Sequence, residues 1–377
     1  MIVDILASGE SPIIDTEKIA SSAKDATSAG VVIQNYVALI LQQSDLSLPD
    51  VLPELPGHQI AARNHAINWR DNIQPFMIRT NSDIIDFANA FDSYYDPLSQ
   101  LATMLQKDPA NNEAIATFKL GLNQLKDLVN TKKENTEMVI KILEQFDSDI
   151  AIDARSFASD FDTASNYLAG KSGEIAALKK QLETYQSSVN RDCWLIAGGS
   201  VAFVAGAVMV VVGFLAEIPT AGASTALVVT GIAVAAGGAT TAIAGAVDLA
   251  NNTKMIGETI VKLSDLGKQY AATSHINSTV QNFRDGAIAA LNAVNSLLIG
   301  WQTLDKDFEE FIKELDRARP DMGFFLQAQL ETAKKDWNDL ADLARILQSY
   351  GSIPVNSGKV NELGRMDPFD AIKALVA

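Results

Sequence analysis

Cysteine and histidine are scarce in this 377-residue sequence, and their scarcity excludes several classes of function. The single cysteine, Cys193, excludes an intramolecular disulfide and every CxxC metal or redox motif. Three histidines, His58, His65 and His275, are too few for a histidine-rich metal site. The sequence has no Walker loop and no GxSxG or HExxH motif. We therefore expect no catalytic residues, no bound metal and no cofactor.

Basic residues are also in short supply, with 30 Lys and Arg against 46 Asp and Glu, a formal net charge of −16. Such a surface repels phosphate backbones and anionic lipid, so we expect no nucleic-acid partner. Any attraction to a membrane must then be hydrophobic. The first twenty residues carry Asp4 and Glu10 and lack a basic segment followed by a continuous apolar one, so no secretory signal peptide is visible.

Acidic residues crowd the stretch 147–162, where five aspartates occur without the spacing of an EF-hand loop. We interpret this cluster as a solvated helix face. His58 and His65 lie seven residues apart, and we expect packing or surface roles for them rather than metal ligation. The five aspartates are Asp147, Asp149, Asp153, Asp160 and Asp162.

Proline is absent from two long stretches, 110–218 and 220–319. Because proline costs about 3 kcal/mol inside a helix, these gaps predict two very long helices. Shorter helices are expected over 16–43, over 58–105 with a kink or break at Pro75 and another at Pro97, and over 322–350.

Apolar residues in both proline-free stretches follow the 3-4 spacing of a heptad seam. The first seam takes one four-residue step at Ala154, and Lys132 is the polar exception within it. The second seam runs from Val280 to Leu315. Two such helices are expected to pack antiparallel, each covering the seam of the other. The predicted fold is all-α, an elongated helical bundle with two long antiparallel coiled helices and an apolar head. The expected parts are N-terminal tail helices (1–109), a long arm (110–192), the head (193–247), a return arm (248–319) and C-terminal tail helices (320–377).

The head is the most informative part of the chain, because residues 193–247 contain a single charge, Glu217. Its two apolar stretches, 193–216 and 220–247, each exceed the roughly 20 residues that a membrane helix needs. They are joined through a predicted tip, Glu217, Ile218 and Pro219. This pattern predicts a membrane-crossing hairpin. The alternative is a pair of core helices, which are hard to bury in a thin bundle when neither has a polar face.

The residues expected to enter the membrane are the large apolar ones of both stretches. They are Trp194, Leu195, Ile196, Phe203, Val204, Val208, Met209, Val210, Val211, Val212, Phe214, Leu215, Leu227, Val228, Val229, Ile232, Val234 and Ile243. Trp194 is expected to anchor at the interface. Small residues expected to let helices approach closely within the head are Gly231, Gly238, Thr241 and Gly245. The β-prone runs 208–212 and 227–229 favour a β-tongue in the soluble form, with helix forming only in lipid.

Long antiparallel arms around a two-segment apolar head resemble the α-helical pore-forming toxins of the cytolysin A and haemolytic enterotoxin family. The chain looks most like the B-type component of the bacterial tripartite systems. The resemblance implies a secreted, soluble form that hides its head and then oligomerises in the membrane of a target cell. It also implies one or two homologous toxin components as partners.

The leading hypothesis is therefore a pore-forming cytolysin or haemolysin component that inserts its hydrophobic hairpin. A resident bacterial membrane-anchored helical scaffold is the alternative, although only Arg191 and Lys254 lie near the ends of the segment. A third hypothesis is a helical partner-binding protein whose insert forms an oligomer core. Because the insert has little polar face, we also expect this chain to anchor the assembly while an amphipathic partner lines the water-filled pore.

Overall fold

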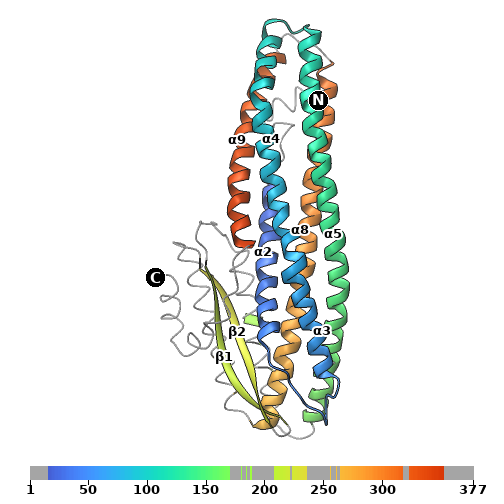
Figure 1. Cartoon of the computed structure of the whole chain (residues 1–377), viewed down its shortest axis with the longest axis vertical. Coiled ribbons are helices and arrows are strands. Elements are labelled where there is room, and N and C mark those ends of the chain that lie inside the picture. Colours follow the sequence, from blue (N-terminus) through green and yellow to red (C-terminus); the bar gives the residue numbers. More distant parts are fainter. Residues whose placement is uncertain are drawn as a thin grey trace. The chain divides into compact units, whose positions relative to one another are not determined.

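In the computed structural model, the described part of the chain consists of long helices and one pair of strands (Figure 1). The structure describes residues 16–169, 208–220, 223–235, 264–316 and 322–351, with single positions at 180, 184, 187, 188, 255 and 260. The elements are α2 (Thr16–Gln42), α3 (Leu55–Asn68), the π-helix η1 (Trp69–Ile73), α4 (Gln74–Lys107), α5 (Asn112–Ala169), β1 (Val208–Thr220), β2 (Ala223–Ala235), α8 (Asp265–Glu314) and α9 (Met322–Gly351). The body is all-α, as the proline gaps and heptad spacing predict.

Contacts divide the chain into two compact units, each with its own core. The first unit consists of Met1–Ala26, Phe76–Lys141 and Leu291–Gln348, and the second of Thr27–Pro75, Ile142–Ala290 and Ser349–Ala377. Helices α2, α5 and α8 contribute residues to both units.

The two proline sites predicted to interrupt the second helix behave differently. Pro75 is the second residue of α4, just after the π-helix η1, which separates α3 from α4. Proline has no N–H and its ring clashes with the carbonyl four residues earlier, and a wider π-turn accommodates both effects. Pro97, in contrast, lies inside α4, which continues without a break.

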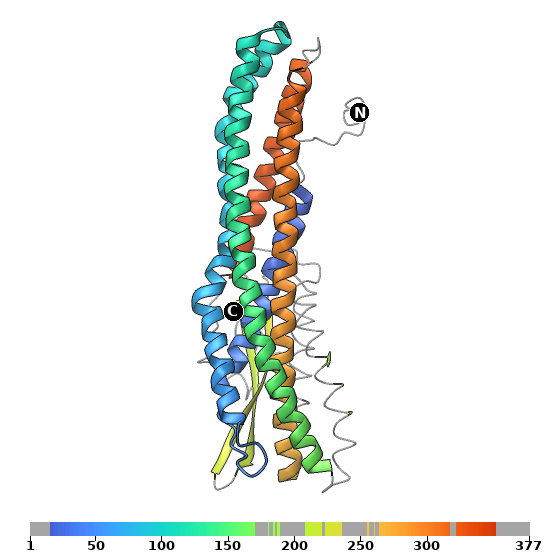
Figure 2. The same cartoon turned by 90° about the vertical axis from the view of Figure 1, so that its right-hand side faces the viewer.

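Helices α5 and α8 pack antiparallel, which ion pairs in the first unit establish. Lys119 pairs with Asp316, and Lys133 Nζ lies 2.8 Å from Asp305 Oδ2. Asp316 lies two residues past the end of α8 and Asp305 lies within it, so the partner number falls as the number on α5 rises and the helices run in opposite directions. Both views show α5 beside α8 (Figure 2). The predicted α8 seam is confirmed, because its apolar residues from Val280 to Leu315 are buried.

An aromatic cluster joins α4, α8 and α9 in the core of the first unit. The Phe87 ring lies 4.5 Å from the Trp337 ring and 5.8 Å from the Trp301 ring, measured between centroids. Trp301 and Trp337 are stacked at 6.2 Å, and all three side chains are fully buried. Each aromatic pair adds about 0.5–1.5 kcal/mol beyond the area it buries, so the cluster is a strong tie between the three helices.

The core of the second unit is built around Phe146 of α5. Its ring lies 5.1 Å from Trp69 of η1 and 5.6 Å from Phe283 of α8. Further along, Phe161 of α5 meets Tyr270 of α8 at 5.5 Å. The α5 partners on α8 again fall in number as α5 advances, so the antiparallel arrangement holds in this unit as well.

Helix α8 is long and apolar enough to cross a membrane by length and composition, and it is the one helix of the described part that is. Its seam residues, however, are buried against the other helices of each unit. A core helix of a bundle needs the same apolar composition. We therefore assign α8 to the protein core.

Candidate functional site: the apolar hairpin and the polar contacts of α3

Strands β1 and β2 form an antiparallel two-stranded sheet within the predicted head. Each strand has 13 residues, and the pairing runs from Val208↔Ala235 to Thr220↔Ala223. At roughly 3.4 Å per residue a strand of this length spans about 44 Å, which exceeds the hydrocarbon thickness of a bilayer. β-branched residues favour the extended conformation, so the strands form where the sequence is richest in valine.

The composition of the hairpin is unusual for a sheet in contact with water. Glu217 is the one charged residue in the two strands, and its partner across the pair is Ala226. Alternate residues of a strand belong to opposite faces, and in both strands both alternate sets are largely apolar. An isolated two-stranded hairpin is marginal in water. The hairpin therefore needs an apolar environment, either protein or lipid.

The predicted membrane residues fall partly inside the hairpin and partly outside the described residues. Those in β1 are Val208, Met209, Val210, Val211, Val212, Phe214 and Leu215, and those in β2 are Leu227, Val228, Val229, Gly231, Ile232 and Val234. The predicted tip residues Glu217, Ile218 and Pro219 lie near the end of β1, which continues to Thr220, the partner of Ala223 in β2. Outside the described residues lie Trp194, Leu195, Ile196, Phe203, Val204, Gly238, Thr241, Ile243 and Gly245.

Helix α3 is fastened to α5 by two histidine–aspartate pairs that the sequence interpretation missed. His58 Nδ1 lies 2.7 Å from Asp160 Oδ2, and His65 Nδ1 lies 2.6 Å from Asp153 Oδ2. Both aspartates are buried, with 7% of Asp160 and 4% of Asp153 exposed. The expectation that the acidic cluster is a solvated helix face is therefore wrong for these two residues.

The matching spacing of these residues is the signal that could have found the pairs. His58 and His65 are seven apart on α3, and Asp153 and Asp160 are seven apart on α5. Two antiparallel helices bring equal heptad spacings into register. The hydrogen bond with Asp153 raises the pKa of His65, burial opposes this effect, and the negative charges of Asp153 and Asp149 raise the pKa further.

Two more side chains of α3 hold the connection between α2 and α3. Gln59 accepts a hydrogen bond from the Leu46 backbone N–H at 2.8 Å and donates one to the Ser44 carbonyl at 3.2 Å. Arg63 donates to the Gln43 carbonyl at 2.6 Å and pairs with Asp45. Arg63 thus satisfies a carbonyl just past the end of α2, where helical partners run out.

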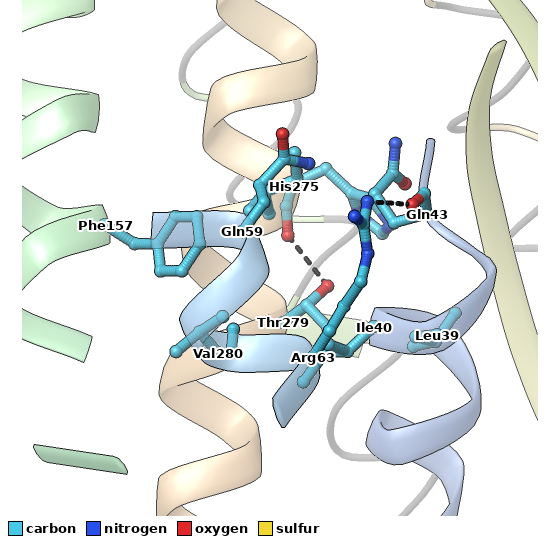
Figure 3. A pocket seen from close by; sticks show the side chains of 11 residues that line it. Leu39, Ile40, Gln43, Gln59, Arg63, Phe157, His275, Thr279 and Val280 are labelled. Atoms are coloured by element: carbon cyan, nitrogen blue, oxygen red, sulfur yellow. Dashed lines mark hydrogen bonds between the residues drawn. The ribbon is translucent and has the colours of Figure 1, made fainter. Parts of the chain in front are cut away.

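A small pocket lies between α2, α3, α5 and α8 in the second unit (Figure 3). Its volume of about 30 Å³ suits a water molecule rather than a substrate. Gln43, Gln59 and Arg63 line it on one side, and His275 and Thr279 come from α8. Among the residues that the structure describes, no group of three or more His, Cys, Asp or Glu side chains is placed to hold a metal.

Fold and site together define a class of protein, a helical bundle that carries a long apolar hairpin. Residues 14–192, just under half of the chain, match the family model for Bacillus haemolytic enterotoxin (HBL). The chain is therefore similar to this toxin family over that stretch, which confirms the resemblance predicted from the sequence. The matched family is one of toxins rather than of enzymes.

Solved structures with the same fold extend the similarity to most of the chain. The HblL1 toxin component of Bacillus cereus has a TM-score of 0.70 and 19% identity, covering 87% of this chain and 95% of that one. Soluble SmhA of the tripartite α-pore forming toxin Smh from Serratia marcescens has a TM-score of 0.73 and 15% identity, covering 89% and 94%. Soluble AhlB of the tripartite α-pore forming toxin AHL from Aeromonas hydrophila has a TM-score of 0.70 and 18% identity, covering 93% and 99%. At these identities the structures show a shared fold.

Proposed function

We propose that this chain is a component of a secreted pore-forming cytolysin, and that its hydrophobic hairpin enters the membrane of a target cell. One observation carries the proposal. An insert with a single charge, Glu217, forms a hairpin of two 13-residue strands on a bundle with the fold of tripartite toxin components. Helical bundles do not need such an insert for their own stability, so its composition serves another purpose.

The energetics of the hairpin favour a conditional insertion. Moving the apolar surface of two such segments from water into lipid releases tens of kcal/mol, at about 25 cal/mol per Å². A form that stays in water must therefore keep this surface covered. Exposure of the hairpin is then the step that commits the protein to a membrane.

Within an assembly, we assign this chain the role of the membrane anchor, most like a B-type component. The insert offers little polar face, and a water-filled pore needs one. One or two homologous components, in addition to copies of this chain, would supply the amphipathic segments that line the pore. Large, stable, ion-selective conductance steps produced by this chain alone in planar bilayers would contradict the anchor role.

The alternative of a resident membrane scaffold finds no support in the comparisons. Two of the structures with this fold are described as soluble components of tripartite pore-forming toxins. A resident membrane protein would also be expected to carry more basic residues beside its apolar segments than Arg191 and Lys254.

Liposome flotation tests the proposal with protein purified without detergent. The vesicles are phosphatidylcholine and cholesterol, because a chain of net charge −16 must bind by hydrophobic contact. We expect the protein to float with the vesicles and to resist a high-salt wash. Val211→Asp places a charge at the fourth residue of β1, opposite Ile232, and at about 3 kcal/mol per buried carboxylate we expect a roughly hundredfold weaker association.

Leu120→Asp is the matched control, since Leu120 is an apolar residue of α5 with 59% of its surface exposed. It adds the same charge to the bundle and should float like the unchanged protein. Two results would contradict the proposal: failure of the unchanged protein to float, and flotation of the Val211→Asp variant at the level of the control.

A further inference from the structure

Helix α3 is held in place mainly by polar contacts. Of its 14 residues, the buried ones are Leu55, Gln59, Ala62 and Ala66, so one large aliphatic side chain contributes to its buried surface. Helix α5, by comparison, buries a seam of Phe, Leu, Val and Ile. Because hydrophobic stabilisation scales with buried apolar area, α3 gains little from it. Its position depends correspondingly more on hydrogen bonds and charge.

The polar contacts of α3 reach two different parts of the second unit. His58 and His65 bind Asp160 and Asp153 on α5. Gln59 and Arg63, which lie between the two histidines in sequence, bind the connection that follows α2. A displacement of α3 would therefore loosen that connection at the same time.

Both ends of α3 adjoin backbone that departs from regular helix. On the N-terminal side the chain forms turns that contain Pro49 and Pro53. On the C-terminal side the π-helix η1 leads into Pro75. π-Turns and prolines interrupt the regular hydrogen-bond ladder of a helix, so the backbone can rotate there at lower cost than within α5.

From these contacts we propose that α3 is a pH-sensitive latch, held against α5 by the His58–Asp160 and His65–Asp153 pairs, and that the His65–Asp153 pair closes it more firmly at mildly acidic pH than at alkaline pH. Protonation of His65 places a full positive charge opposite the buried carboxylate of Asp153, so that the hydrogen bond then joins two opposite charges instead of a neutral ring and a carboxylate. Loss of this proton weakens the His65–Asp153 pair, and α3 is then held against α5 less firmly, because the same helix depends on both pairs.

The charged groups around the latch set the direction of the effect. Helix α5 contributes Asp149, Asp153 and Asp160, and its Asp147 faces Arg284 of α8. Helix α3 contributes Arg63, whose charge is paired with Asp45, and α8 contributes His275 to the neighbouring pocket. The negative charges of Asp153 and Asp149 act on His65 and favour its protonated form.

The dependence of the latch's stability on pH follows from the raised pKa of His65. A group whose pKa is higher in the folded state contributes stability that is fully present below its unfolded pKa, about 6.5 for histidine. This contribution is lost as the pH rises through the folded pKa. The latch is therefore closed at pH 5.5 and loosened at pH 8.0.

Hydrogen–deuterium exchange without lipid tests the latch, so the result does not depend on the proposed toxin function. Protection factors are determined for peptides from α3 and, as an internal reference, for α5 peptides from 118–129. Protection factors correct for the pH dependence of the intrinsic amide exchange rate. We expect α3 protection relative to this reference to be at least about threefold higher at pH 5.5 than at pH 8.0. No such change is expected within the reference.

Variants separate the latch from other titrations. His58→Gln/His65→Gln should remove the pH dependence of α3 protection. Asp153→Asn/Asp160→Asn changes the partners of these histidines on α5 to neutral side chains of similar shape, and it should remove the pH dependence as well. His275→Gln leaves both pairs in place and should behave like the unchanged protein. Equal α3 protection at both pH values in the unchanged protein would overturn the proposal, as would an unaltered pH dependence in both double variants.

Discussion

Lys132 occupies a position in the α5 seam where the heptad pattern calls for an apolar residue. It is buried, with 8% of its surface exposed, and its Nζ lies 2.8 Å from Asp83 Oδ1 and 3.4 Å from Asp86 Oδ2 on α4. Asn135 donates a second hydrogen bond to Asp83 at 3.1 Å. A buried ion pair adds little net stability over apolar residues but fixes which residues face each other. Lys132 therefore sets the alignment of α5 against α4.

Lys132→Ala should destabilise the protein by about 3 kcal/mol, because it leaves the carboxylate of Asp83 buried without its cation. Urea unfolding followed by circular dichroism measures the change. Lys132→Leu/Asp83→Leu removes both charges and should unfold at a urea concentration equal to or above that of the unchanged protein.

Lys313→Ala serves as the control for Lys132→Ala, because Lys313 forms an exposed pair with Glu309 one turn away. Such surface pairs contribute less than about 1 kcal/mol. Equal effects of Lys132→Ala and Lys313→Ala would show that the buried pair does not have the role assigned to it.

Single residues also mark the limit of what the sequence predicts about the site. Apolar seam residues such as Phe118 and Leu304 are predictable, since spacing alone fixes their face. The burial of Asp153 could not be predicted from the sequence, because an aspartate beside the seam is solvated unless another helix covers it. That covering helix, α3, has a weak apolar pattern of its own.

Helix α2 packs on α8 by placing isoleucines over glycines. In the first unit, a Cβ added at Gly300 would lie 2.8 Å from Ile19 Cγ1, and in the second a Cβ at Gly286 would lie 2.9 Å from Ile33 Cγ1. The two isoleucines and the two glycines are each fourteen residues apart, which is two heptads. A missing side chain on α8 thus lets each α2 side chain approach closely.

Gly300→Ala should destabilise the protein by about 1–2 kcal/mol, because overpacking against Ile19 outweighs the roughly 1 kcal/mol that alanine gains over glycine in a helix. Thermal unfolding measures the change. The matched control is Gly30→Ala in α2, where no atom lies within 4 Å of the added Cβ, and it should be stabilising by about 0.5–1 kcal/mol.

A double-mutant cycle identifies the contact behind this effect. In an Ile19→Ala background the clash is gone, so Gly300→Ala should become neutral or stabilising. If Gly300→Ala costs the same free energy in both backgrounds, the overlap with Ile19 is not its cause.

At the scale of elements, the helices were predictable and the hairpin only in part. Proline gaps and heptads predict α5 and α8, since one repeating interaction governs a whole helix. The valine-rich runs favour strands, but the register that pairs Val211 with Ile232 depends on contacts across the hairpin that the sequence does not specify. The π-turn before Pro75 was likewise beyond prediction, because a proline can kink, break or widen a helix.

At the scale of the whole molecule, the order of parts along the chain carries most of the functional information. The sequence predicts a helical bundle around an apolar insert, and the family match over 14–192 lies outside that insert. Similarity in the bundle and composition of the insert are thus independent grounds for the proposed function. Their combination predicts a protein that carries an apolar, membrane-inserting segment within a chain whose net charge is −16.

Entry of the hairpin into lipid is the central claim, and a fluorescent label on β1 tests it most directly. Because Cys193 is the single cysteine, Cys193→Ser/Val211→Cys provides one labelling site in the valine-rich first part of the strand. An environment-sensitive dye at this site should shift its emission to the blue when phosphatidylcholine and cholesterol vesicles are added, and quenchers on the lipid tails should then quench it. The same dye on Cys193→Ser/Leu120→Cys should show neither effect. If the Val211 site stays accessible to aqueous quenchers and unaffected by lipid quenchers, the hairpin does not enter the membrane and the account is contradicted.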